Sequence, residues 1–145
     1  MTKKRERCRG YITGKSIEQG FVPQQVQNIV VRNYCKNNNI EYLWSAVEFL
    51  MPNSYFHLEN ILNNLEQVDG IVFYNLHLMP ENRLMRKRIY NTVIKKKKKI
   101  HFAVENFFAC DEESCKKIEK TILIKRALPH CINNISQLKD ALPTN

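Results

Sequence analysis

The sequence predicts a single α/β domain in which helices cover both faces of a mostly parallel sheet of four or five strands. Three observations lead to this prediction. The chain has 145 residues, which is enough for one hydrophobic core and too few for two. Short apolar runs alternate with longer segments whose apolar side chains recur at helical spacing. The connections between them are short, as is typical of parallel strands joined by crossover helices.

The first half of the chain contains two predicted strands, each followed by a helix. Residues 8–13 form the first apolar run, and residues 22–39 follow it with apolar side chains at helical spacing. Residues 40–45 form the second run. A helix is expected over residues 54–67, where Ser54 can cap the first turn and leucine and isoleucine side chains lie on one face.

The second half repeats this order. Residues 71–74 are a continuous apolar run, as expected of a strand that is buried on both faces. A helix is expected over residues 80–96 and a fourth strand over residues 100–105. The last predicted helix covers residues 111–128, because acidic side chains in its first turn interact favourably with the helix dipole and Pro129 is expected to end it.

These elements divide the chain into one folded unit and two ends. We assign residues 1–8 to a basic, flexible arm, residues 9–128 to the α/β domain, and residues 129–145 to a tail or an arm that packs on a neighbour. Much of the formal net charge of +9 comes from the arm and from the lysine run at residues 95–99. Such charge can bind an anionic partner, but a solvated helix end is the simpler interpretation, so nucleic acid is the less favoured partner.

The cysteines and the start of the chain indicate the compartment. The five cysteines are odd in number and form no C-x-x-C pair, a pattern typical of unpaired thiols in a reducing compartment. We therefore expect no metal site, and no motif indicates a cofactor. No apolar signal-peptide segment follows the basic start, and no apolar stretch approaches the roughly 20 residues that span a bilayer. The sequence thus predicts a cytoplasmic protein without a membrane span.

Candidate functional residues follow from the predicted topology. In an open parallel sheet, ligands bind beyond the carboxyl ends of the strands, where the strand order reverses. The predicted ligand-binding residues follow these strands or lie on the first helix: Thr13, Lys15, Ser16, Gln24, Gln27, Arg32 and Asn75. The predicted acid or base residues are Glu48, His77 and Glu105.

The roles within this set are constrained by local sequence. Residues 13–16 contain the Gly-Lys-Ser of a P-loop but lack the upstream glycine at the required spacing, so they predict only a weak anion site. An enzyme with this site would use Glu105 or Glu48 as acid or base, and Lys15 or Arg32 to hold an anion. His101 lies near the other end of its strand and is expected to be a buried structural residue.

Several strings of the sequence occur in the same order in a family of small bacterial proteins. They are Gly10-Tyr-Ile, Val22-Pro-Gln-Gln-Val-Gln-Asn28, Arg32, Tyr34-Cys35, Ser45-Ala46 with Glu48, Met51-Pro52, Asp69-Gly-Ile-Val72, Leu76 with Pro80, and His101-Phe-Ala-Val-Glu105. Over about residues 9–128 the chain resembles the sporadic carbohydrate cluster protein family, whose members are encoded among surface-polysaccharide biosynthesis genes. The resemblance implies a setting in carbohydrate biosynthesis and assigns no catalytic residue.

The chain also resembles, more distantly, the catalytic domain of resolvase-type serine recombinases. Gly10-Tyr11 with a nearby Ser16 is similar to the start of that domain. Thr13 stands where the family has an arginine, and His77-Leu78 stands where it has an Asp-Arg pair. Phosphoryl transfer to serine requires arginines that neutralise the phosphate charge. The resemblance therefore implies a resolvase- or flavodoxin-like three-layer fold without the recombination reaction.

These observations lead to three classes of function. The leading expectation is a cytoplasmic protein of lipopolysaccharide or capsule biosynthesis that binds a sugar, a sugar nucleotide or an anionic precursor in the carboxyl-end crevice. The alternative is a nucleic-acid-binding or recombinase-like module that uses the basic helix. The third is a non-catalytic oligomerisation or accessory protein. A homo-oligomer is compatible with all three, and the sequence does not select between an enzyme and a binding protein.

Overall fold

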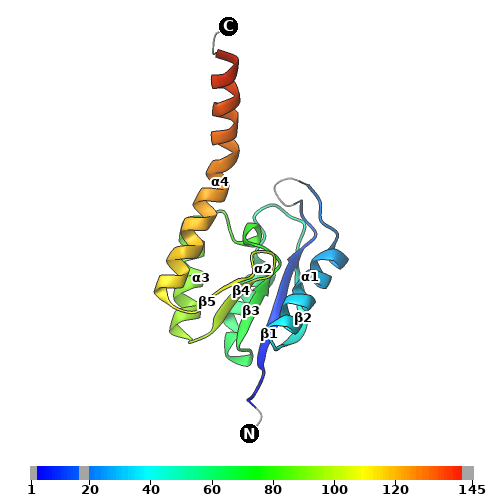
Figure 1. The fold of residues 1–145 in the computed structure, drawn as a ribbon. Coiled ribbons are helices and arrows are strands. Elements are labelled where there is room, and N and C mark those ends of the chain that lie inside the picture. Colours follow the sequence, from blue (N-terminus) through cyan, green and yellow to red (C-terminus); the bar gives the residue numbers. More distant parts are fainter. Residues whose placement is uncertain (1–2, 17–19, 142–145) are drawn as a thin grey trace.

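A five-stranded sheet forms the centre of the fold, with strand order β2-β1-β3-β4-β5 (Figure 1). The computed structural model describes residues 3–16 and 20–141, with side chains up to residue 128. The first four strands are parallel, and β5 is antiparallel to β4. The strands are β1 (Glu6–Thr13), β2 (Ile40–Glu48), β3 (Gly70–Phe73), β4 (Lys99–Phe102) and β5 (Phe107–Ala109).

Helices cover both faces of the sheet, so the predicted three-layer α/β fold is confirmed. One core cluster joins the first helix to the sheet through Val31, and the larger cluster joins the other three helices to the opposite face. Neighbouring side chains of β1 divide between the two, because Tyr11 faces one layer and Ile12 the other. The helices are α1 (Gln24–Asn37), α2 (Phe56–Asn63), α3 (Arg83–Lys95) and α4 (Glu112–Ala141), with short 3-10 turns at Leu65–Gln67 and Leu76–Leu78.

The fourth predicted strand is shorter than expected. It ends at Phe102, and residues 103–106 form a turn that leads back into β5, with Asn106 in the left-handed region at φ 53°. The antiparallel β5 contains only three residues and no clear alternation, so periodicity did not predict it. Glu105 consequently lies in a turn and not at the end of a parallel strand.

The two ends of the domain also differ from the prediction. β1 begins at Glu6, so residues 6–8 belong to the sheet and not to the predicted arm. The prediction that Pro129 ends the last helix is wrong, because α4 continues to Ala141 and projects from the body in Figure 1. Proline removes one backbone hydrogen bond, and a long helix with helix-forming residues on both sides can absorb this loss. No described helix combines the length and the apolar character that a membrane crossing requires.

The lysine run forms the connection between α3 and β4. The Lys96 ammonium donates to the carbonyl of Leu62 at 3.0 Å and lies 2.8 Å from the Glu66 carboxylate. Lys97 occupies the left-handed region at φ 56°, where the helix ends. Part of the run is therefore paired within the protein, and the prediction of a wholly solvated helix end is too simple.

Candidate functional site

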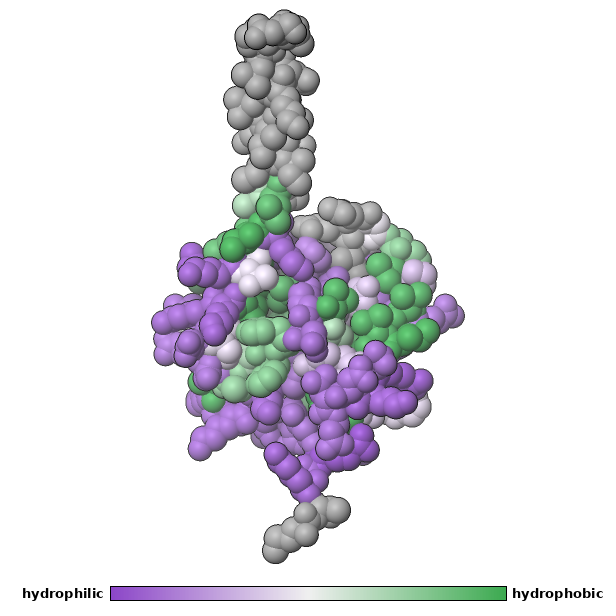
Figure 2. Space-filling model, viewed as in Figure 1, coloured by the Kyte–Doolittle hydropathy of each residue, from purple (hydrophilic) through white to green (hydrophobic). Residues whose placement is uncertain are grey.

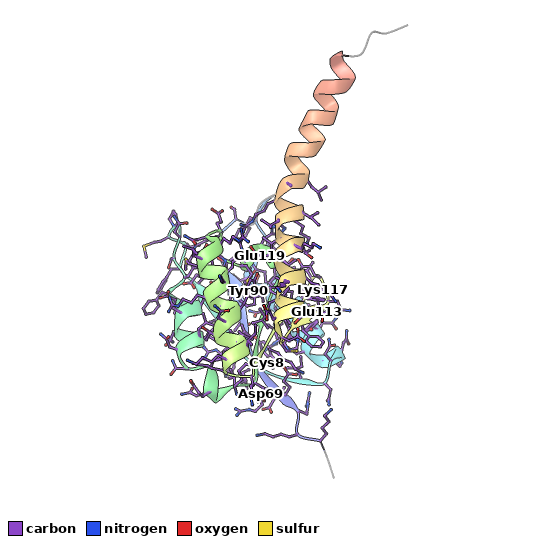
Figure 3. The ribbon with its side chains drawn as sticks, turned by 90° about the vertical axis from the view of Figure 1, so that its left-hand side faces the viewer. Cys8, Asp69, Tyr90, Glu113, Lys117 and Glu119 are labelled. Carbon is purple, nitrogen blue, oxygen red and sulfur yellow. The ribbon has the colours of Figure 1, made fainter. Side chains whose placement is uncertain are left out.

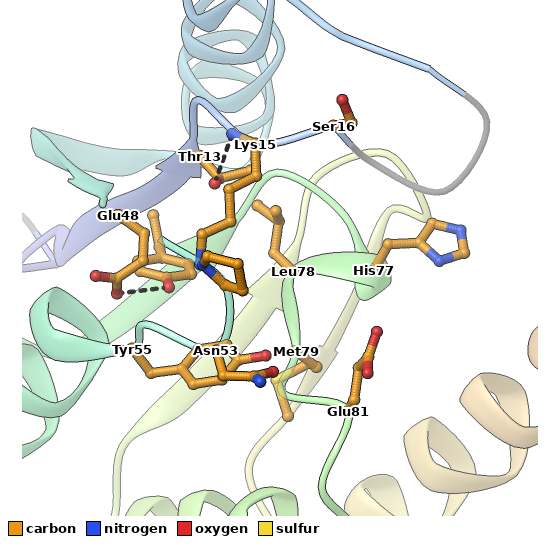
Figure 4. A pocket seen from close by; sticks show the side chains of 12 residues that line it. Thr13, Lys15, Ser16, Glu48, Asn53, Tyr55, His77, Leu78, Met79 and Glu81 are labelled. Carbon is orange, nitrogen blue, oxygen red and sulfur yellow. Dashed lines mark hydrogen bonds between the residues drawn. The ribbon is translucent and has the colours of Figure 1, made fainter. Parts of the chain in front are cut away.

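The carboxyl ends of β1 and β2 border a cavity of about 250 Å³ (Figure 4). It lies where β1 has β2 on one side and β3 on the other, which is the point where the strand order reverses. Loops after all three strands enclose it. The lining residues are Tyr11, Thr13, Lys15, Ser16, Glu48, Pro52, Asn53, Tyr55, His77, Leu78, Met79 and Glu81.

Lys15 points into this cavity from the loop after β1 (Figure 4). Its ammonium group donates to the carbonyl oxygen of Ser54 at 3.0 Å and lies 5.4 Å from the centre of the Tyr55 ring. The Thr13 hydroxyl accepts a hydrogen bond from the Lys15 backbone N–H at 3.1 Å, which turns the chain toward the cavity. Lys15 thus places a cation beside an aromatic ring. The sequence pattern alone does not predict that these two side chains lie together.

Gln27 holds the end of β1 in place. Its side-chain amide donates to the carbonyls of Thr13 at 2.7 Å and Val22 at 2.8 Å, and it accepts from the Thr13 N–H at 3.1 Å. The side chain is fully buried. The structure therefore places Gln27 between α1 and β1, where it positions Thr13, and not among the residues that line the cavity.

Glu48 lies at the wall of the cavity and binds the start of α2. Its carboxylate accepts from the Tyr11 hydroxyl at 2.8 Å and from the backbone N–H groups of Leu58 at 3.1 Å and His57 at 3.2 Å. Burial alone would raise the pKa of Glu48, but the hydrogen bonds from His57, Tyr11, Leu58 and Phe49 outweigh it and hold this pKa below its ordinary value. Glu48 is therefore ionised at neutral pH and cannot donate a proton there.

Five of the ten predicted site residues line the cavity together: Thr13, Lys15, Ser16, Glu48 and His77. Figure 4 shows that the Ser16 hydroxyl and the His77 ring point away from the Lys15 ammonium group. Sequence reasoning missed Tyr11, Asn53, Tyr55 and Glu81. The prediction ended the second strand at residue 45, whereas β2 extends to Glu48. The rule that sites follow strand ends would have selected the loop with Asn53 and Tyr55 had that boundary been correct.

The other five predicted residues do not line this cavity, so Asn75 and Glu105 do not share it with Lys15 and Ser16. The Glu105 carboxylate accepts from the Leu76 N–H and the Lys125 ammonium, each at 3.1 Å, because the turn after β4 carries it toward α4. Asn75 is buried, and its Oδ1 has no partner among the described residues.

Gln24 and Arg32 are exposed on α1. The Arg32 guanidinium lies 5.2 Å from the centre of the Tyr42 ring, away from the cavity lining. The Gln24 amide lies beside the loop after β1, since a Cβ added at Gly14 would be 2.8 Å from its Nε2, but Gln24 does not line the cavity. Helical spacing placed both residues on α1 correctly and did not specify that only Gln24 lies next to that loop.

Two solved structures are similar to this chain in fold. The chain superimposes on the N-terminal catalytic domain of TP901-1 integrase with a TM-score of 0.59 at 11% identity, covering 83% of this chain and 98% of that one. It superimposes on a resolvase family site-specific recombinase from Streptococcus pneumoniae with a TM-score of 0.60 at 9% identity, covering 92% and 97%. The chain has a resolvase-like fold. At this identity the likeness concerns the fold alone, and the sequence matches no protein-family model and no curated protein.

Proposed function

We propose that this chain is a cytoplasmic protein of bacterial surface-carbohydrate biosynthesis and that it binds a sugar phosphate or sugar nucleotide in the cavity at the carboxyl ends of the strands. The observation that carries the proposal is the position of Lys15, whose ammonium group enters the cavity beside the Tyr55 ring. The resemblance of the sequence strings to the sporadic carbohydrate cluster family supports the choice of ligand class.

The chemistry of the cavity suits such a ligand. An ammonium group carries three N–H donors, so the bond from Lys15 to Ser54 does not prevent it from binding a phosphate oxygen. The Tyr55 ring offers an apolar surface to the C–H face of a sugar, and Asn53 offers both donors and acceptors. The volume of about 250 Å³ lies just below the range of about 300–1,000 Å³ of drug-sized sites, which suits a sugar phosphate or the sugar end of a sugar nucleotide.

Replacing Lys15 by alanine is expected to weaken binding of a hexose phosphate by about 10- to 100-fold. A hydrogen bond to a charged group contributes about 1.5–3 kcal/mol, and each 1.4 kcal/mol corresponds to a factor of ten. The measurement is the shift in melting temperature with hexose 1-phosphates, nucleotide sugars and the unphosphorylated sugars, followed by calorimetric titration of any ligand that raises it.

Arg32→Ala is the matched control, because it also removes one cation but from an exposed position over the Tyr42 ring that does not line the cavity. Wild-type affinity in this variant and loss in Lys15→Ala would support the cavity. Equal loss in both variants, or no stabilisation by any phosphorylated sugar, would overturn the proposal.

A second candidate is a nucleic-acid-binding or recombinase-like module, which the likeness to two recombinase domains favours. Against it, the described residues that line the cavity include lysine, histidine and two glutamates but no arginine. Phosphoryl transfer with a serine nucleophile needs more positive charge than this. Titration with a DNA duplex at several salt concentrations separates the two, because phosphate contacts make affinity fall steeply with salt.

The third expectation is an oligomerisation protein. We propose that two copies of the chain associate through contacts between their α4 helices. Figure 2 shows apolar surface where α4 leaves the body. Leu123, Ile124 and Leu128 are each about half exposed there. Apolar side chains on one projecting helix are typical of a helix–helix contact. Sedimentation analysis of the wild type and of a Leu123→Glu/Ile124→Lys variant tests this contact.

A further inference from the structure

Three side chains with different ligand atoms meet on the α1 face of the sheet, at the end away from the cavity. Glu6 and Cys8 come from β1, two residues apart and therefore on one face, and His101 comes from β4. One carboxylate oxygen, the thiol sulfur and one imidazole nitrogen all lie within 4.8 Å of one another. Figure 3 shows Cys8 near Asp69, at the end of the sheet opposite to the projecting part of α4.

Gly70 permits this meeting. β3 lies between β1 and β4, so a side chain on β3 at this level would separate the cluster. A Cβ added at Gly70 would lie 3.2 Å from the Cys8 sulfur and 2.6 Å from the Lys99 carbonyl oxygen. The absent side chain leaves the space through which His101 reaches Glu6 at 2.8 Å.

We propose that Glu6, Cys8 and His101 form a site for one divalent cation of the zinc type. Zinc accepts carboxylate oxygen, thiolate sulfur and imidazole nitrogen at about 2.0–2.3 Å, and tetrahedral bonds of these lengths place neighbouring ligand atoms about 3.3–3.5 Å apart. The Cys8 sulfur already lies 3.4 Å from Glu6 Oε1. The Nε2–Oε1 distance of 2.8 Å has to open by about half an ångström.

The residues around the cluster orient these ligands. The Tyr34 hydroxyl is hydrogen-bonded to His101 Nδ1 at 2.8 Å, which directs Nε2 toward Glu6 and Cys8. A partner on the second ring nitrogen is the usual support of a metal-binding histidine. The Lys99 ammonium lies 3.5 Å from Glu6 Oε2, which leaves Oε1 for the ion. Cys8 and His101 are buried, whereas the Glu6 side chain is 23% exposed, so an ion and a water as fourth ligand have access from that side.

Coordination requires a thiolate at Cys8 and an unprotonated Nε2 on His101. The proton on Nε2, which bonds to Glu6, moves to Nδ1, where the Tyr34 hydroxyl accepts it in a hydrogen bond. The Cys8 S–H bond breaks, its proton passes to solvent, and the thiolate donates an electron pair to the cation without any change of oxidation state. The sequence expectation of no metal rested on cysteine spacing along the chain. This site uses one cysteine with ligands of two other kinds, a combination that spacing does not detect.

Cobalt(II) titration of the full chain tests the site, in a Cys110→Ser/Cys131→Ser background that removes the exposed thiol and the one on the projecting helix. We expect one equivalent to bind, with a thiolate-to-cobalt charge-transfer band in the near ultraviolet. Cys8→Ser should abolish that band. Cys35→Ser, which removes another buried thiol of the same core cluster, should retain it. Tyr34→Phe should weaken cobalt binding by about 10- to 100-fold while leaving the band at saturation.

X-ray absorption of the zinc-loaded wild type gives a readout that does not depend on any variant being folded. One sulfur at about 2.3 Å, with nitrogen or oxygen ligands at about 2.0 Å, is the expected result. No uptake of cobalt or zinc would overturn the proposal. So would a charge-transfer band that survives in a folded Cys8→Ser variant, or a zinc shell without sulfur.

Discussion

Replacing Arg86 by methionine should lower the free energy of unfolding by about 3–5 kcal/mol, because it breaks a buried ion pair by removing one partner. The Arg86 side chain is 2% exposed and lies 2.6 Å from the Glu119 carboxylate. Its other donors bind the carbonyls of Pro80 at 3.0 Å and Glu81 at 2.7 Å. The Tyr90 hydroxyl donates to the same carboxylate at 2.8 Å, so the network joins α3 to α4 (Figure 3).

Urea denaturation of Arg86→Met beside Arg88→Met measures this effect. Arg88 lies on the same helix, but its pair with Glu59 is exposed at both ends, so its loss should cost less than about 1 kcal/mol. The double variant Arg86→Met/Glu119→Leu should recover much of the stability, because it leaves no unpaired buried charge. Equal losses in the two single variants would show that the Arg86 network is not a major contribution.

Replacing Glu48 by alanine should lower the free energy of unfolding by about 3 kcal/mol or more. It leaves the buried Tyr11 hydroxyl and the first N–H groups of α2 without an acceptor, and each unsatisfied buried donor costs about 1–3 kcal/mol. Glu48→Gln keeps an acceptor and the side-chain shape, so its loss should be smaller. Chemical denaturation at neutral pH compares the two variants.

The same carboxylate predicts an acid dependence with a definite sign. The pKa of Glu48 is lower in the folded chain than in the unfolded one, so the unfolded state binds the proton first as pH falls. The contribution of Glu48 is fully present above the unfolded value of about 4.3 and is lost as pH falls through the folded value. Melting temperature measured from neutral to acid pH should therefore fall less steeply in Glu48→Gln than in the wild type. Parallel curves would contradict this assignment.

Local signals predicted the elements but not the partners of the polar side chains. The rule for strand ends selected both Lys15 and Glu105, since each lies at the carboxyl end of a predicted parallel strand. The turn at residues 103–106 carries Glu105 to Lys125, whereas Lys15 enters the cavity. Gln27 was selected as a polar residue near a helix start, and the structure satisfies it with the backbone of β1.

For His101, the sequence predicted the structural role but not the partner. A structural role for His101 was expected from its position on the strand, and its burial with two hydrogen-bond partners agrees with that expectation. The sequence pattern assigns its partner Glu6 to a basic arm, whereas Glu6 begins β1. No local pattern relates two residues that are 95 positions apart.

The sequence by itself determined that this protein is a three-layer α/β domain. Short apolar strand runs alternate with segments of helical apolar spacing, and packing helices on both faces of a sheet is one of few ways to bury the apolar side chains of both. Only the tertiary structure decided which polar groups share a site. The strand order brings Lys15 beside Tyr55. Gly70, which has no side chain, leaves the space in which His101 reaches Glu6. Each of these pairs joins segments that are far apart in the chain. Local spacing along the sequence carries no information about which such segments lie together in the fold.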